Sequence, residues 1–562
     1  MMKKKLLAFV LSLAMTMGLT TAFAEFADVP NDAWYSSAVN FMTQSGYMNG
    51  ISETEFAPDA SMTRGMFVTV LGRMDGASVS DYNKKIFPDV EMDKWYAPYV
   101  NWALENNIVS GYDDLRFHPD EAINRAQLSV MVKKYVNYRG YEIADNPSAY
   151  DSYIDDAEIP QWAKDGADFM RRTGVITGDD YGAFMPASLA TRAQIAATVM
   201  RLRKVLNGET LEIPQRKVRT KAELLMDGMK LKDKVYQMIA VTPEQITGVN
   251  TATMAGSATE DAVERHPVGM VVYMGKNILD AEQIKTMVTN TSSYFKVKPF
   301  MAISEETGAG AQLASRIGSD TFKDAYDYRM SEPTDVKNAF TTLSAQLKNC
   351  GFNVNLAPTA DLWSNPANTY IAKRAFGNNY AECSPRVVAA IEGIKGNSLL
   401  SAMKYFPGYG SSAQNPLNGE CRSSITVEDL KNYDFNTYKD GIDAGADIVI
   451  CANIFMDKID AENPASMSAK IISELLKNEL GFKGIVMTDD LRMKSVSQKY
   501  TTSESVVKAV EAGCDMLLCP SDLEEAVNAL VKAVVEGRIS EARINDSVLK
   551  ILEAKEKAGI LG

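Results

Sequence analysis

The run Gly484-Ile485-Val486-Met487-Thr488-Asp489-Asp490 is a short apolar stretch that ends in two adjacent carboxylates. Continuous apolar runs of this kind are typical of parallel strands that are covered on both faces. Seven similar runs occur in the second part of the chain, and segments of about 30 to 50 residues separate them. They are residues 238–241, 269–274, 300–303, 354–357, 399–403, 448–452 and 515–519.

This alternation predicts an α/β protein whose eight parallel strands close into a (β/α)8 barrel, because the intervening segments have room for crossover helices. A doubly wound open sheet is the alternative architecture. No Gly-x-Gly-x-x-Gly motif or phosphate loop follows the first run, and this favours the barrel. The functional site of such a barrel is expected at the carboxyl ends of its strands.

Polar side chains do follow several of the runs directly. Adjacent side chains on a strand point to opposite faces, so at most one of Asp489 and Asp490 enters the predicted barrel mouth. A carboxylate there can attack an anomeric carbon, and the structural alternative is a helix N-cap for residues 491–496. Lys404 ends another run, where it is either a ligand for sugar hydroxyls or an ordinary solvated lysine.

Three internal repeats precede this region, at residues 26–73, 87–135 and 153–201. In each repeat a tryptophan precedes a glycine by 16 residues, and that glycine precedes an arginine by 14 residues. Each repeat is predicted to form a helix, a loop and a second helix that starts at the arginine. Units of this size bury little core alone, so we expect the repeats to pack together. The repeated residues are Trp34, Trp95 and Trp162, and Arg64, Arg125 and Arg192.

The recurring tryptophan and arginine have two interpretations. One is structural, with the indole in a packing position and the guanidinium in a salt bridge. The other is ligand binding, because a guanidinium fork pairs with a carboxylate and an indole ring stacks on a pyranose. The second interpretation predicts an acidic sugar as the ligand.

The first 24 residues have the pattern of an export signal. Residues 1–5 are basic, residues 6–19 are nearly all apolar, and Ala22-Phe23-Ala24 supplies a small-x-small cleavage pattern. An uncleaved membrane anchor is the alternative, but the apolar stretch is shorter than the roughly 20 residues that span a bilayer. We therefore expect a secreted chain that starts at Glu25.

Composition excludes several classes of function. The formal net charge of −13 makes nucleic acid an improbable partner. His118 and His266 are the only histidines, so a cluster of histidine metal ligands is not available. The six cysteines lack metal-ligand spacing and are predicted to be core thiols.

The three repeats resemble S-layer homology domains. The Thr-Arg-Ala-Glu signature of that family occurs as Thr63-Arg64-Gly65-Met66, Asn124-Arg125-Ala126-Gln127 and Thr191-Arg192-Ala193-Gln194, which keep the arginine and lack the glutamate. The resemblance implies a three-pronged module that binds a pyruvylated secondary polysaccharide of a Gram-positive-type cell wall. It implies a location in the cell wall or S-layer. The expected polysaccharide contacts are Asp28, Trp34, Arg64, Asp89, Trp95, Arg125, Trp162 and Arg192.

Residues 232–561 resemble the β-N-acetylglucosaminidases of glycoside hydrolase family 3. Residues 404–410, Lys-Tyr-Phe-Pro-Gly-Tyr-Gly, are similar to the Lys-His-Phe-Pro-Gly-His-Gly of that family, and residues 487–493 are similar to its nucleophile segment. The resemblance implies a retaining mechanism without a cofactor, in which Asp489 is the nucleophile and Lys404 and Arg374 bind the sugar. Tyr405 and Glu306, which lie in matching motifs, are further expected substrate contacts.

The chain departs from this family at its proton donor. The family carries an Asp and a His on a loop beyond the lysine motif, and Asn415 and Leu417 occupy those positions here. Neither side chain transfers a proton. Glu420 is the nearest carboxylic acid on the loop, where it is either a substitute acid or a surface glutamate. The sugar-holding motif Asp-Gln-Glu-Gly-Gly-Arg is also altered, with Ser304 and Ala309 in place of its Asp and Arg.

The expected organisation is a signal peptide (1–24), three repeats (25–80, 81–140 and 148–204), a linker (205–220) and a barrel (221–562). The predicted function is a wall-anchored hydrolase of the β-N-acetylhexosaminidase type, acting on peptidoglycan-derived or other N-acetylglucosaminyl glycans. The alternative is a catalytically impaired glycan-binding or structural wall protein, because the acid/base pair is replaced.

Overall fold

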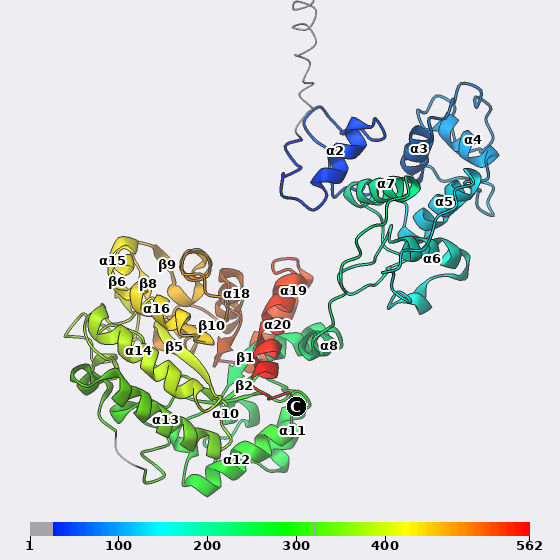
Figure 1. Cartoon of the computed structure of the whole chain (residues 1–562). Helices are drawn as coiled ribbons and strands as arrows, with labels where there is room; N and C mark the ends of the chain where they lie inside the picture. Colours follow the sequence, from blue (N-terminus) through cyan, green and yellow to red (C-terminus); the bar gives the residue numbers. More distant parts are fainter. Residues whose placement is uncertain (1–25, 320–321, 562) are drawn as a thin grey trace, which may run out of the picture. The chain divides into compact units, whose positions relative to one another are not determined.

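The computed structural model describes residues 26–319 and 322–561 (Figure 1). The chain divides into two compact units, residues 1–218 and 219–562, which are described separately below. The predicted export signal lies outside the described residues. In the two described ranges, every helix is too short or too polar to cross a bilayer.

The first unit is built from three helix pairs, one for each predicted repeat. The second helix of each repeat packs against the first helix of another, so that α3 contacts α4, α5 contacts α6, and α7 contacts α2. The buried side chains of all three repeats form one hydrophobic core. The helices are α2 (Ser36–Gln44), α3 (Arg64–Asp75), α4 (Ala97–Glu105), α5 (Arg125–Tyr138), α6 (Lys164–Thr173) and α7 (Arg192–Leu206), with 3-10 turns η1 (Asp156–Glu158) and η2 (Gln161–Ala163) before α6.

A ring of backbone hydrogen bonds joins the three repeats just before their second helices. The amide of Met62 donates to the carbonyl of Ala190, Ala190 to Ile123, and Ile123 to Met62, at 2.9–3.0 Å. Each segment thus donates to one neighbour and accepts from the other. This ring, together with the shared core, confirms the expectation that the repeats pack together.

The altered signature of the repeats has a local structural meaning. Asn124 and Thr191 are N-caps, and the side chains of Gln127 and Gln194 bond back to their backbone amides to complete capping boxes. Glutamine therefore replaces the family's glutamate without loss of this interaction. Met66 cannot form it, so the first repeat keeps only the single cap from Thr63.

The second unit confirms the predicted barrel. All eight predicted runs form strands, their pairings are all parallel, and they follow the order β10-β7-β5-β4-β3-β2-β1-β11. A bridge between Met487 and Met516 connects the two ends of this order, which closes the sheet. The strands are β1 (Ile239–Val241), β2 (Met270–Tyr273), β3 (Phe300–Ile303), β4 (Val354–Asn355), β5 (Leu400–Phe406), β7 (Ile448–Cys451), β10 (Ile485–Thr488) and β11 (Leu517–Leu518).

Helices follow the strands and cover the outside of the barrel (Figure 1). A small sheet of β6 (Arg422–Ser423), β8 (Phe455–Met456) and β9 (Asp460–Pro464) lies in the loops after β5 and β7. The helices are α8 (Lys221–Asp227), α9 (Leu231–Gln237), α10 (Pro243–Thr247), α11 (Ser257–Arg265), α12 (Ala281–Ser293), α13 (Pro333–Asn349), α14 (Tyr380–Lys395), α15 (Val427–Asn432), α16 (Asp434–Asp443), the π-helical η8 (Lys470–Glu479), α17 (Lys494–Ser497), α18 (Thr502–Ala512), α19 (Leu523–Val535) and α20 (Glu541–Lys557). The 3-10 segments are η3 (Gly275–Asn277), η4 (Gly308–Gly310), η5 (Ala325–Met330), η6 (Ala372–Arg374) and η7 (Ala465–Met467).

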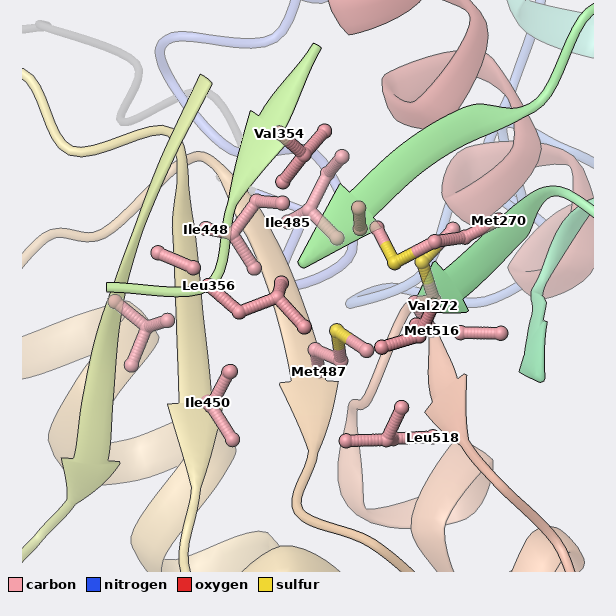
Figure 2. Close-up of a cluster of buried hydrophobic side chains, with 14 of the residues drawn as sticks. Met270, Val272, Val354, Leu356, Ile448, Ile450, Ile485, Met487, Met516 and Leu518 are labelled. Atoms are coloured by element: carbon pink, nitrogen blue, oxygen red, sulfur yellow. The ribbon is translucent and has the colours of Figure 1, made fainter. Parts of the chain in front are cut away.

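The interior of the barrel is a packed apolar core. Side chains from β2, β4, β7, β10 and β11 meet in the space that the strands enclose (Figure 2). Both faces of each strand are therefore buried, which explains why the strands are continuous apolar runs in the sequence. The six cysteines are buried and free, as predicted. The labelled side chains are Met270, Val272, Val354, Leu356, Ile448, Ile450, Ile485, Met487, Met516 and Leu518.

Residues 209–219, in the predicted linker, contain neither helix nor strand. They nevertheless contact the third repeat. The side-chain amide of Asn146 donates to the carbonyl of Leu211 at 2.7 Å, and the amide of Lys217 donates to the carbonyl of Asp180 at 2.9 Å. The boundary between the two units follows directly, at Val218.

Asp515 joins the barrel to its last helix. Its fully buried carboxylate accepts from the amide of Val486 (3.1 Å) and from the hydroxyl of Ser547 (2.8 Å). Arg543 and Lys550 on α20 lie 3.3 and 3.5 Å from it. One carboxylate thus anchors α20 to β10.

We predict that Asp515→Ala lowers the free energy of unfolding of the second unit by about 3 kcal/mol, because it leaves buried donors and cations without their acceptor. Asp546→Ala, which removes an exposed carboxylate from the same helix, is the control and should change it by less than about 0.5 kcal/mol. Hydrogen exchange of the β10 and β11 amides measures the change in the free energy of unfolding for each variant. Equal protection in the two variants would contradict the anchoring role.

Candidate functional site

Asp489 lies at the carboxyl end of β10 and is 4% exposed. One of its oxygens, Oδ1, accepts from the amide of Asp490 (2.9 Å), and Oδ2 accepts from the phenol of Tyr409 (2.8 Å). Burial raises the pKa of Asp489 to about 6, although both hydrogen bonds oppose the shift. This buried carboxylate is the group that the geometry offers as a nucleophile.

Asp490 has a different environment. It pairs with Arg492 (2.6 Å) and also accepts from the amide of that residue (2.9 Å). The N-cap of the following helix, α17, is Met493, so the structural alternative that made this acidic pair a helix cap is wrong. The two adjacent carboxylates therefore differ in role: Asp489 lies buried beside Tyr409, and Asp490 holds Arg492.

A buried ion cluster lies beside Asp489. The carboxylate of Glu306 accepts from Nε and Nη2 of Arg374 (both 2.8 Å), from Thr359 (3.0 Å) and from Nζ of Lys404 (2.6 Å). These two cations hold the pKa of Glu306 far below its usual range, despite its burial. Lys404 is 2% exposed, so the alternative of a solvated lysine is wrong.

This cluster gives Glu306 a structural role. Three of its contacts are to Oε1 and one is to Oε2. Glu306 therefore positions Lys404 and Arg374, and its direct contact with a substrate stays a prediction. Lys404 also donates to Ser304 (2.6 Å) and keeps one further donor.

Three tyrosine rings surround the mouth. The ring centroids of Tyr370, Tyr405 and Tyr409 are 5.2–5.8 Å apart, and the guanidinium of Arg374 lies 5.3 Å from two of them. The hydroxyl of Tyr405 accepts from Arg374 at 2.6 Å. Tyr370 was not predicted from the sequence, since no motif includes it. Tyr370 is partly exposed and Tyr405 is 6% exposed, so these two rings offer apolar faces of the kind on which a pyranose stacks, whereas Tyr409 is fully buried.

The turn that carries Tyr409 is fixed by buried polar groups. Asp361 accepts from the amides of Tyr409 (2.6 Å) and Gly410 (3.1 Å), and Asn368 donates to the carbonyl of Tyr409 (2.9 Å). A Cβ atom at Gly410 would lie 1.6 Å from the carbonyl oxygen of Leu362, so only glycine fits there. Burial raises the pKa of Asp361 to about 7.

The loop after this turn carries no proton donor at the two altered positions. The side chain of Asn415 accepts from the amide of Leu417 (2.9 Å), and the Leu417 side chain is 49% exposed. The carbonyl of Pro416 accepts from the amide of Ser495 (3.1 Å), which ties the loop to α17. Glu420 forms an ion pair with Arg422 on the surface. This geometry favours the interpretation of Glu420 as a surface glutamate.

Neither histidine is part of the cluster beside Asp489. His266 precedes β2, at the end of the barrel opposite to the mouth, and contacts Tyr236 (3.2 Å). His118 belongs to the second repeat in the other unit, where it contacts Asp114 (2.8 Å). In the described ranges, no group of three or more His, Cys, Asp and Glu side chains is arranged to hold a metal ion.

The first unit contains three equivalent grooves, and each combines residues from all three repeats. The tryptophan and the arginine of one repeat therefore line different grooves, which the sequence did not indicate. The first groove contains Gly50, Trp95 and Arg192, the second Gly111, Trp162 and Arg64, and the third Gly178, Trp34 and Arg125.

The groove arginines are cations without a carboxylate partner in the described part of the chain. Each donates its Nε to the carbonyl of a buried phenylalanine, at 2.5–3.0 Å. Burial lowers the pKa of all three guanidinium groups. The three tryptophans are 54–66% exposed. These features disfavour the salt-bridge interpretation, because no carboxylate of the described residues lies within ion-pair distance of these guanidinium groups. Each guanidinium also lies over the ring of a buried phenylalanine.

Each groove also has a second basic residue that was not predicted. Arg73, Lys134 and Arg201 line the first, second and third groove, respectively. Each follows the recurring arginine of its repeat by nine residues. This constant offset was the signal that could have identified them.

The aspartates of the repeats have a structural role. Asp28 accepts from the amides of Phe56 (2.8 Å) and Ala57 (2.6 Å), and Asp89 accepts from Phe117 (3.0 Å) and His118 (2.7 Å). Asp155 repeats the arrangement in the third repeat. These carboxylates hold the loop before the second helix, and the contact of Asp28 and Asp89 with polysaccharide stays a prediction.

Residues 230–554 match the family described as Glycosyl hydrolase family 3 N terminal domain, and residues 25–65 and 86–129 match the S-layer homology domain. The chain is 24% identical to beta-hexosaminidase A of Pseudoalteromonas piscicida over 328 residues, which are 53% of this chain and 54% of that protein. It is 28% identical to a beta-hexosaminidase of Psychromonas ingrahamii over 284 residues, 48% of this chain and 81% of that one. The chain thus spans about half the length of the first of these relatives.

Two solved structures are similar to the barrel unit. A glycoside hydrolase family 3 β-N-acetylglucosaminidase from Paenibacillus sp. str. FPU-7 is 26% identical with a TM-score of 0.56, over 59% of this chain and 63% of that one. A β-N-acetylhexosaminidase from Beutenbergia cavernae is 26% identical with a TM-score of 0.53, over 58% of this chain and 99% of that one.

We predict that Asp89→Ala increases hydrogen exchange at residues 115–119 by at least about tenfold, because two backbone amides lose a charged acceptor. Asp93→Ala, an exposed aspartate in the same repeat, is the matched control and should leave that exchange unchanged. Unchanged exchange in Asp89→Ala, with weaker binding to cell walls, would instead support Asp89 as a ligand-binding residue.

Proposed function

The chain belongs to glycosyl hydrolase family 3, and from this membership we propose that it is a wall-anchored glycosidase of the β-N-acetylhexosaminidase type. The observation that carries the proposal is the buried carboxylate of Asp489 at the end of β10, next to the Glu306–Arg374–Lys404 cluster. The similarity to two beta-hexosaminidases supports N-acetylhexosaminyl glycans, including peptidoglycan-derived ones, as the substrate class.

In the proposed reaction, Asp489 attacks the anomeric carbon and the leaving group departs with the electrons of the broken bond. The Lys404 ammonium and the Arg374 guanidinium, fixed by Glu306, bind sugar hydroxyls, and Tyr405 supplies a ring face. Water then attacks the glycosyl ester and restores the carboxylate. The step needs no metal and no organic cofactor.

The proposed enzyme lacks assistance for the leaving group. General acid catalysis contributes about 10² to 10⁴ in rate, most of all for a basic leaving alkoxide. Asn415 and Leu417 supply none of it, and Glu420 is paired with Arg422. The tied-down loop favours a second candidate function, a barrel that binds glycan with little turnover.

For the first unit we propose three S-layer homology domains, the third at residues 148–204, that bind an acidic secondary wall polysaccharide. The third repeat supports this because it has the same capped helix and the same aspartate contacts as the two matched repeats, and it contributes to every groove. Export through residues 1–24 and a location in the cell wall or S-layer complete the proposal.

We predict that the full chain binds purified cell walls and that the triple variant Trp34→Ala, Trp95→Ala and Trp162→Ala loses this binding. The exposed indoles are available for stacking, and their removal leaves the core intact. Ile154→Ala and Leu115→Ala remove exposed apolar side chains outside the grooves and are the control. Cosedimentation measures binding, and equal binding to walls stripped of secondary polysaccharide would contradict the proposed ligand.

We predict that hydrolysis of aryl N-acetylglucosaminides slows steeply as the pKa of the leaving phenol rises, while a natural disaccharide is cleaved about 10² to 10⁴-fold more slowly than with a proton donor. Asp489→Asn should abolish all turnover, since an amide forms no glycosyl ester. A flat dependence with rapid disaccharide cleavage would reveal a proton donor, and Glu420→Gln would then test it. No turnover of a dinitrophenyl substrate by the folded chain would favour the glycan-binding alternative.

A further inference from the structure

Tyr409 connects three neighbouring strands of the barrel at one oxygen atom. It lies in the turn after β5, it is 0% exposed, and its phenol reaches Asp489 after β10 at 2.8 Å. The amide of Asn453, just after the intervening strand β7, donates to the same phenol oxygen at 2.6 Å. The phenol is therefore held at a fixed point above β7.

The two contacts determine the direction of the phenol proton. Because the Tyr409 oxygen accepts from Asn453, its own hydrogen is free for one acceptor. The Asp489 carboxylate at 2.8 Å is a far stronger acceptor than the Met493 sulfur at 4.0 Å. Burial and the nearby Asp489 charge raise the pKa of Tyr409 far above its ordinary value, so the phenol stays protonated and donates at every working pH.

The partner strand is equally fixed. The side-chain amide of Asn453 donates to the carbonyl of Asp490 (2.8 Å), and its oxygen accepts from the hydroxyl of Ser466 (2.7 Å). Asp361 and Asn368 hold the backbone of Tyr409 from the other side. Every polar atom around the phenol thus has a partner, and the phenol cannot turn away from Asp489 without breaking this network.

We propose that Tyr409 is the positioning residue of the nucleophile: its phenol orients the carboxylate of Asp489 and stabilises the ionised form that attacks the sugar. The proposal rests on the proposed function, because only a glycosidase needs this carboxylate as a nucleophile. The family resemblance has a histidine at this position. A phenol differs from an imidazole in that it does not titrate between pH 5 and 8.

The phenol acts in both steps of the reaction. In the first, an Asp489 oxygen bonds to the anomeric carbon, the bond to the leaving oxygen breaks, and an aryl leaving group departs as its phenolate. In the second, a water oxygen bonds to that carbon, the ester bond breaks, and the water proton passes to solvent. Tyr409 keeps its proton throughout, and its hydrogen bond to the carboxylate re-forms at full strength as the charge returns. Its loss should slow formation of the ester, because fewer Asp489 carboxylates are ionised and correctly oriented, and should slow breakdown, because the returning charge lacks its donor.

Several groups surround the Asp489 carboxylate besides Tyr409. They are Asp490 on its own strand, Lys404 on β5, the Tyr370 phenol, and the thiols of Cys451 and Cys519. Lys404 favours the charged carboxylate, Asp490 disfavours it, and burial disfavours it most strongly. The hydrogen bond from Tyr409 lowers the pKa of Asp489, whereas burial raises it. Removal of the phenol should therefore raise the pKa of Asp489.

The test compares Tyr409→Phe with Tyr236→Phe in the full chain. Tyr236 is also buried and also has one side-chain contact, to His266, but it lies before β1, at the opposite end of the barrel from the mouth. With a dinitrophenyl N-acetylglucosaminide, kcat/KM of the unaltered protein should rise with pH as Asp489 loses its proton, with a midpoint near 6. Tyr409→Phe should move this midpoint upward and lower kcat about tenfold with KM little changed. Tyr236→Phe should match the unaltered protein in the pH midpoint, in kcat and in KM.

A measurement that needs no turnover separates the positioning role of Tyr409 from the proposed glycosidase function. Infrared spectra of protein with 13C-labelled aspartate, minus those of Asp489→Asn, follow the protonation of this carboxylate directly. An upward shift in Tyr409→Phe, in a chain that cleaves no substrate, would support the control by Tyr409 and overturn the glycosidase function. Turnover with an unshifted carboxylate and an unchanged pH profile in Tyr409→Phe would overturn the role of Tyr409 alone.

Discussion

The mouth of the barrel depends on the neutralisation of one buried carboxylate. Glu306 is 4% exposed, and a charge at that depth is stable only in contact with opposite charges. Lys404 and Arg374 supply these charges from β5 and η6, and their positions are fixed by the same contacts. Glu306 is thus paired with cations, whereas the carboxylate of Asp489 accepts only from an amide and a phenol among the described residues.

The groove arginines of the three repeats, unlike Glu306, are not neutralised by an opposite charge in the described part of their unit. Arg64, Arg125 and Arg192 are held by backbone carbonyls, and no carboxylate neutralises them in the described residues. The cations of the barrel mouth are thus neutralised by a carboxylate of the same unit, whereas the groove cations are not. This contrast underlies the proposal of a neutral sugar as ligand of the barrel and an acidic sugar as ligand of the repeats.

The carboxylate of Asp489 and the loop after Tyr409 are held in different ways. Asp489 lies in a dense network that includes Tyr409, Asn453 and Asp361. In the loop, the side chain of Asn415 accepts from the amide of Leu417, and the carbonyl of Pro416 accepts from Ser495. In the proposed mechanism, such a site supports a glycosyl ester and gives no proton to a basic leaving group, so its chemistry depends on the leaving group that the substrate brings.

The sequence by itself determined the architecture of both units. Strands buried on both faces need continuous apolar runs, so the eight runs were visible without any tertiary information, and Asp489 was placed at the mouth because it directly follows one. The repeats were visible because their spacing is constant, and the missing proton donor because two residue types changed.

Only the tertiary structure decided how distant residues are partnered. The ion cluster of the mouth joins residues that are up to about 100 positions apart in the sequence: Glu306, Arg374 and Lys404. No local sequence pattern indicates whether a carboxylate binds a sugar or a lysine. Asp28 and Asp89 accept hydrogen bonds from amides 28 and 29 residues away, and no local pattern indicates these partners. The tryptophan and arginine of one repeat separate into different grooves because packing is cyclic. Local periodicity fixes the elements, whereas the competition for each buried polar atom is settled only when the elements are brought together in space.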